Sequence, residues 1–163
     1  MRQWLTLGLL MALLPACAGA GIFQKEASVR FSTRADAVVI TQRHTTGTVG
    51  PQYFHEDTLV IHGDGTWQAI RVYPYATPER REALGTGVLS PDRLKALVDV
   101  AASQPRFLDL PASSSDETVG SGTRRIDLAL ETGTHSVAVV GRGPEAFERF
   151  DRAITAETMP LNP

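Results

Sequence analysis

The sequence predicts an α+β domain, an antiparallel sheet of about five strands with two amphipathic helices on one face. Three observations support this fold. An Asp-Gly turn at 63–65 joins two β-prone runs. A second pair of alternating runs surrounds Thr132 and Gly133, and helical periodicity follows Ser90 and again Pro144. The connections within the strand pairs are short, which favours antiparallel pairing because parallel strands need a long crossover.

The first half of the domain is predicted to consist mainly of strands. The β-branched or alternating runs are Val29 to Phe31, Ala37 to Thr45, Thr58 to His62 and Thr66 to Tyr73. The last two flank Gly63-Asp64-Gly65, whose residues tolerate positive φ and so predict a hairpin. Thr77 and Pro78 resemble a helix start, so we expect a helical turn from Thr77 to Leu84 and a further strand from Gly85 to Leu89.

The second half predicts both helices. Ser90 caps the first, Pro105 ends it, and one face carries Leu94, Leu97, Val98 and Ala101. Phe107, Leu108 and Leu110 are expected in the core, and residues 112–122 in a polar loop. Residues 124–131 and 135–141 form the second strand pair, and residues 144–158 form the last helix, with Phe147, Phe150 and Ile154 on one face.

The N-terminus resembles a lipoprotein export signal. Arg2 precedes 11 apolar residues, too few for the roughly 20 of a spanning helix. Leu14-Pro15-Ala16-Cys17 then fits a lipobox, with cleavage between Ala16 and Cys17 and lipidation of Cys17. Ordinary signal cleavage after Ala18 or Ala20 would instead release a soluble protein. Ala18 after the cysteine fits sorting to an outer membrane, facing the periplasm.

These patterns divide the chain of 163 residues into four parts. We expect a signal peptide at 1–16, a lipidated cysteine and tether at 17–28, a single α+β domain at 29–158 and a C-terminal tail at 159–163. Cys17 is the only cysteine, so the domain can form no internal disulfide, thiolate metal site or cysteine nucleophile. The net charge is −2, which does not provide the positive field that nucleic-acid binding needs.

Motifs for catalysis are missing from the sequence. It contains neither His-Glu-x-x-His nor Gly-x-Ser-x-Gly, so we predict no catalytic residues, no metal and no small-molecule cofactor. His55, His62 and Asp64 offer nitrogen and oxygen ligands for an alternative, a metal-dependent hydrolase. Asp64 is also expected in a tight turn for backbone reasons alone.

The aromatic residues suggest an interaction face. Trp67, Arg71 and Tyr73 alternate along one strand, and Tyr75 follows it. If the helices leave this face open, it would present side chains typical of protein interfaces. Otherwise Trp67 and Tyr73 are core residues.

The segments LVIHGDGTW, GVLSPDRLKALVDVAASQPRFLDLP and RIDLALETGTHSVAVVG carry a family resemblance. They resemble uncharacterised bacterial envelope lipoproteins, and residues 57–156 are similar to emfourins, the inhibitors associated with protealysin-type metalloproteases. The residues that match are turn, cap and core residues. The resemblance implies either a non-enzymatic lipoprotein that binds a protein partner or supports an envelope assembly, or a protease inhibitor.

Overall fold

The computed structural model describes residues 29–116 and 120–158. Cys17, the predicted signal peptide, the tether and the C-terminal tail lie outside these residues. The elements follow the order β1 Val38–Thr45, η1 Pro51–Tyr53, β2 Glu56–His62, β3 Thr66–Tyr73, β4 Arg80–Val88, α1 Pro91–Ala102, η2 Phe107–Asp109, β5 Ser113–Ser115, β6 Thr123–Leu130, β7 Gly133–Val140 and α2 Glu145–Thr158.

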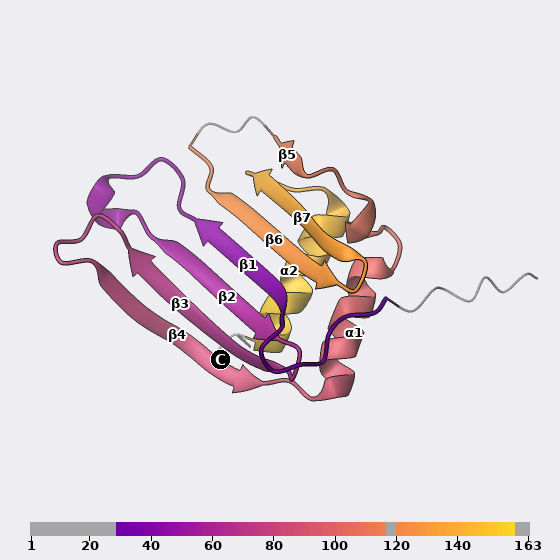
Figure 1. The fold of residues 1–163 in the computed structure, drawn as a ribbon. Helices are drawn as coiled ribbons and strands as arrows, with labels where there is room; N and C mark the ends of the chain where they lie inside the picture. The colour runs from indigo at the N-terminus through magenta and orange to yellow at the C-terminus, as the bar shows by residue number, and fades with distance from the viewer. Residues whose placement is uncertain (1–28, 117–119, 159–163) are drawn as a thin grey trace, which may run out of the picture.

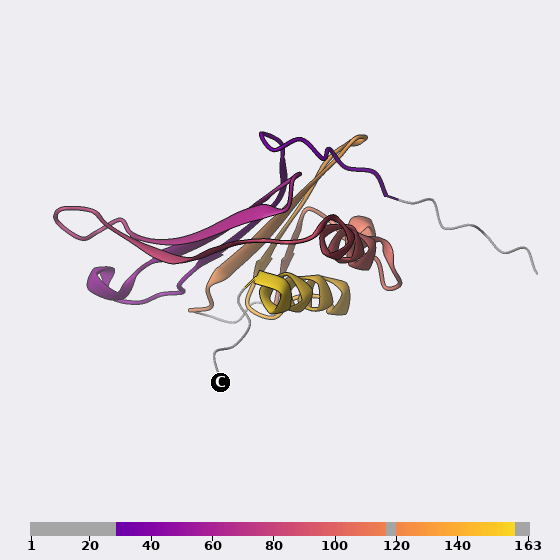
Figure 2. The same ribbon diagram turned by 90° about the horizontal axis from the view of Figure 1, so that it is seen from below.

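The fold is α+β, as predicted, but the sheet is larger and mixed. It has seven strands in the order β4-β3-β2-β1-β6-β7-β5. Five of the six pairings are antiparallel, and β5 runs parallel to β7. Figures 1 and 2 show both helices on the same side of this sheet. The expectation of about five antiparallel strands is therefore wrong in strand number and in the direction of one edge.

Three segments account for the difference. The expected helical turn at Thr77 to Leu84 is wrong, because Arg80–Val88 forms one continuous strand against β3. The polar loop at 112–122 contains β5, which pairs with the outer edge of β7. Val29 to Phe31 is not a strand. The side chains of Val29 and Phe31 instead pack against the core, and the Arg30 carbonyl accepts a hydrogen bond from the Glu131 amide at 3.0 Å.

The predicted β2–β3 hairpin is confirmed. Gly65 has φ +86° and donates its amide hydrogen to the His62 carbonyl at 3.0 Å, a conformation that glycine adopts without strain. The Asp64 carboxylate accepts from both the amide and the hydroxyl of Thr66, at 2.9 and 2.6 Å. These bonds lower the pKa of Asp64. Asp64 thus stabilises the turn.

The core lies between the sheet and the two helices. All four residues of the predicted α1 stripe are buried, and so are Phe147, Phe150 and Ile154 of α2. They pack on the helix-side residues of the sheet, which are Ile40, Leu59, Ile61, Ala69, Ile126, Leu128, Val137 and Val139. Ser90 caps α1 by accepting from the Arg93 amide at 3.3 Å, as its sequence predicts.

One arginine ties the helices together. Arg149 of α2 donates to the carbonyls of Ser103, Gln104 and Pro105 at 2.5, 2.5 and 2.6 Å. These carbonyls follow the last turn of α1, where backbone acceptors have no partner within the helix. Arg149 therefore caps α1 from its neighbour and fixes how the two helices pack.

Candidate interaction site

The helices cover only part of their side of the sheet. Figure 2 shows the β3–β4 end projecting beyond both helices. On that side of β3, Ala69 is 2% exposed, whereas the next two residues of the same face, Arg71 and Tyr73, are half-buried. We call the part that carries Asp57, Arg71, Tyr73, Arg80 and Glu82 the open face. It is polar where the covered part is apolar.

The predicted interaction residues divide between these two parts. Trp67 lies on the helix side, packs partly against the core and covers two glycines of β4. A Cβ atom on Gly87 would lie 2.7 Å from the Trp67 indole nitrogen, so this strand position has no room for a side chain. Arg71 and Tyr73 belong to the open face. Tyr75 lies past its end and is 63% exposed.

Arg71 forms the best-ordered ion pair of the open face. Asp57 and Arg71 are directly opposite in the β2–β3 register. The Arg71 Nε and Nη2 atoms donate to the two carboxylate oxygens of Asp57 at 2.7 and 2.8 Å. These two bonds raise the pKa of the Arg71 guanidinium, so the group is charged at every physiological pH. The pair holds Arg71 in one orientation.

Tyr73 extends this cluster toward β4. The Arg80 guanidinium carbon lies 3.8 Å from the centre of the Tyr73 ring, a cation–π contact. The Tyr73 hydroxyl donates to Glu82 at 3.3 Å, and Arg80 forms an ion pair with the same carboxylate group at 3.3 Å. Aromatic and guanidinium groups are therefore presented together, in partly fixed positions.

A row of polar residues, four of them charged, crosses five strands of the sheet. The strand registers place Arg124, His44, Asp57, Arg71 and Glu82 opposite one another in this order on β6, β1, β2, β3 and β4. We call them the charged row. Asp57, Arg71 and Glu82 alternate in charge on neighbouring strands and attract one another, which supports this register. Between the charged row and α2 lies a cavity of about 180 Å³.

The end of the charged row next to α2 is firmly tied. Arg124 donates to both oxygens of Glu148, to Asp151 at 3.0 Å and to the Gly141 carbonyl at 2.9 Å. Gln42 donates to the other oxygen of Asp151 at 2.7 Å. The hydrogen bonds from Arg124 lower the pKa of Glu148 to about 2 and in turn raise that of Arg124. These groups join the sheet to α2 and are not free for a ligand.

The alternative metal site is not assembled. His55 precedes β2 and His62 ends it, so seven residues of extended chain put them roughly 23 Å apart. The His55 ring contacts Tyr73 and its Nδ1 atom lies 3.1 Å from the Tyr53 carbonyl, while Asp64 is bound to Thr66. Across residues 29–116 and 120–158, no cluster of three histidine or acidic side chains could hold a metal ion. His55, His62 and Asp64 therefore do not come together around one metal ion, as the metal-dependent hydrolase would require.

Sequence reasoning missed most of the charged row. No sequence motif contains His44, Asp57, Glu82 or Arg124 together, because strands distant in the sequence bring them to one place. One signal was available. Asp57 and Arg71 each lie seven residues from Asp64 at the hairpin centre, so the turn alone predicts that they face each other.

Comparison with protein-family models found no match, and comparison with curated proteins found no significant similarity. Within the described ranges, neither helix has the length and apolar character needed to cross a bilayer.

Proposed function

We propose that this chain is a non-enzymatic envelope lipoprotein that binds another protein, or supports an envelope assembly, through the open face. A lipid on Cys17, added after cleavage from Ala16, would hold it on the outer membrane facing the periplasm. The proposal includes no cofactor and no nucleic acid. The observation that carries the binding part is the open face itself, where Arg71, Tyr73 and Arg80 are ordered by ion pairs and ring contacts but remain accessible.

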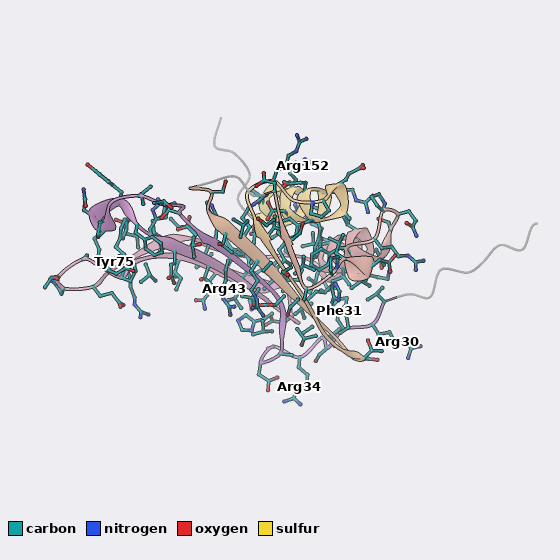
Figure 3. All side chains as sticks on the ribbon, turned by 90° about the horizontal axis from the view of Figure 1, so that it is seen from above. Arg30, Phe31, Arg34, Arg43, Tyr75 and Arg152 are labelled. Atoms are coloured by element: carbon teal, nitrogen blue, oxygen red, sulfur yellow. The ribbon has the colours of Figure 1, made fainter. Side chains whose placement is uncertain are left out.

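The placement of Arg30 bears on how the described domain would lie relative to the membrane. Figure 3 shows Tyr75 at one end of the molecule and Arg30 at the opposite end. The predicted tether of 12 residues, 17–28, could extend up to roughly 40 Å. A lipid at Cys17 would therefore allow the Tyr75 end to lie away from the membrane, within reach of a partner.

Aromatic and arginine side chains dominate the binding energy of many protein interfaces. In the open face, their orientation is set before binding by Asp57 and Glu82, so a partner would lose little conformational entropy on ordering them. The alternating charges of Asp57, Arg71 and Glu82 would also favour a partner with a complementary pattern, which contributes to specificity.

Photocrosslinking from two adjacent positions of β4 tests the binding part. Glu82 lies on the open face opposite Arg71, whereas Arg81 lies opposite Val72 on the other side of the sheet. Both are exposed. A crosslinking amino acid at position 82 should give a discrete adduct in intact cells, and the same group at position 81 should not. No adduct from either position, or equal adducts from both, would contradict the proposal.

Membrane attachment needs a separate test. The Cys17→Ser variant should move from the membrane fraction to the soluble fraction, and loss of labelling by a palmitate analogue should accompany the change. A variant that still sediments with membranes would exclude lipid anchoring through Cys17.

A protease inhibitor is the second candidate. The order of α1, the Phe107–Asp109 turn, the β6–β7 hairpin and α2 is the order on which the resemblance to emfourins rests. Adding the full chain to thermolysin should then slow peptide hydrolysis in proportion to inhibitor concentration. Unchanged hydrolysis at a large molar excess would exclude inhibition of this enzyme.

A further inference from the structure

Three connections meet at the end of the sheet farthest from Arg30. They are residues 46–55 between β1 and β2, residues 74–79 between β3 and β4, and residues 120–122 before β6. We call this region the loop tip. The Thr48 amide donates to the Gly120 carbonyl at 3.1 Å, and the Phe54 and Tyr75 rings meet edge to face at 5.3 Å. The connections therefore form one surface.

The loop tip contains an open hollow of about 560 Å³, and none of its lining residues within 29–116 and 120–158 is charged. Charged residues make up 21% of the chain, so about two would be expected among ten lining positions. A phosphate, a carboxylate or an ammonium group would find no opposite charge there, although such groups are usually bound through charge-assisted hydrogen bonds. The hollow therefore suits an uncharged ligand.

Hydroxyl groups supply the polar part of the lining. Those of Thr45 and Thr46 are bound to the backbone of Thr123 and His55. By contrast, the hydroxyls of Thr48, Ser121 and Thr123 form no hydrogen bond with the part of the chain that the structure describes. A hydroxyl can both donate and accept. These three groups can therefore bind a ligand that also carries hydroxyls.

Aromatic rings supply the apolar part. The rings of Tyr75 and Phe54 line the hollow, and Tyr75 is 63% exposed, although large aromatic side chains are more often buried. An aromatic ring has a negative face, which attracts the weakly positive C–H groups of a sugar ring. An exposed tyrosine beside hydroxyl groups matches the two kinds of surface that a pyranose presents.

We propose that the loop tip binds an uncharged saccharide, with Tyr75 stacking on one of its rings and Thr48, Ser121 and Thr123 bonding its hydroxyls. An extended peptide fits less well. The amides of Thr46, Thr48, Tyr53 and Phe54 already donate to carbonyls within the loop tip, so a peptide backbone would find few free donors. This proposal does not depend on a protein partner at the open face.

Nuclear magnetic resonance of the full chain tests the proposal, in a detergent without a sugar headgroup. The probes are chitohexaose, maltohexaose and, for comparison, a proline-rich decapeptide. At least one hexasaccharide should shift the amide resonances of residues 46–55, 74–79 and 120–123 at concentrations up to about 10 mM. No shift with either saccharide would overturn the proposal, and so would shifts at the loop tip with the peptide alone.

Variants then locate the site. Tyr75→Ala should weaken saccharide binding about tenfold or more, because it removes an exposed stacking surface. Thr48→Val should weaken it too, since it replaces a hydroxyl by a methyl group of similar size. Val88→Ala is the matched control, because Val88 is 69% exposed at the other end of β4. Equal affinity in Tyr75→Ala and the unaltered chain, or equal loss in Val88→Ala, would exclude binding at the loop tip.

Discussion

Arg124 and Glu148 join the sheet to α2 through two side-by-side hydrogen bonds, the Nη1 bond measuring 2.9 Å. Glu148 also accepts from the Gly143 amide at 2.7 Å, which satisfies one of the free amides at the start of α2. The Arg124 guanidinium lies 5.3 Å from the Phe147 ring centre. One ion pair thus connects the charged row, the start of α2 and the core.

This pair predicts an acid-dependent loss of stability. The folded protein lowers the pKa of Glu148 from 4.5 to about 2, so folding favours the charged form. The stabilisation is complete above about pH 4.5 and disappears as the pH falls from there toward 2. Glu148→Gln should therefore lower the free energy of unfolding at pH 7 by about 1–3 kcal/mol and reduce its decline between pH 5 and 2.

Urea denaturation at several pH values measures this effect. Glu145→Gln is the control, since Glu145 is exposed in the same helical turn and has no ion pair among those found in residues 29–116 and 120–158. It should leave the pH dependence unchanged. A Glu148→Gln protein with the same acid-dependent decline as the unaltered chain would contradict the assignment.

Arg149 predicts a second effect on stability. The Arg149→Lys variant keeps the positive charge but loses the planar guanidinium that bonds three carbonyls. The end of α1 therefore loses its cap. We expect a loss of about 2 kcal/mol in the free energy of unfolding. Arg152→Lys, on the exposed side of α2, should change it by less than about 0.5 kcal/mol. Equal values for the two variants in urea denaturation would show that Arg149 does not act as a cap.

The contacts of Gly85 and Gly87 with Trp67 predict two alanine variants that differ in thermal stability. A Cβ atom at Gly87 would lie 2.7 Å from the Trp67 ring, whereas one at Gly85 would lie 3.3 Å away. Gly87→Ala should therefore lower the thermal midpoint more than Gly85→Ala, with a cost of about 1–3 kcal/mol for displacing the indole. Thr86→Ala is the control between them, because Thr86 is exposed on the other face. The reverse order of the two glycine variants would contradict this packing.

The elements that the sequence predicts correctly are those whose signals are local. The Asp-Gly turn, the cap at Ser90 and the stripe from Leu94 to Ala101 each depend on residues close in the chain. Thr77 and Pro78 misled the prediction for the same reason, since they resemble a helix start. Here β3 provides a strand edge that pairs with every residue of Arg80–Val88 except Leu84, and this tertiary pairing overrides the local signal.

β5 and the open face could not be read from the sequence. The segment Ser113–Ser115 has no marked preference for the strand conformation. It forms a strand because the edge of β7 is available for pairing. The charged row likewise depends on strand registers, and that of β1 with β6 connects residues more than 70 positions apart. The aromatic face was identified from alternation alone, but alternation does not show how far the helices extend over it.

Asp57 and Arg71 provide the last prediction, which separates stability from binding. Both side chains are partly exposed, at 22% and 30%, so a double-mutant cycle should give a coupling free energy of about 0.5–1 kcal/mol.

Binding of the partner should respond to the loss of Arg71 more strongly than stability does. Arg71→Ala should abolish most of the photocrosslinked adduct from position 82, because it removes a preoriented guanidinium from the open face. Arg43→Ala is the matched control, since Figure 3 shows Arg43 on the face opposite the helices, where it pairs with Asp127. Adduct yields that fall equally in the two variants would show that the partner does not recognise the open face.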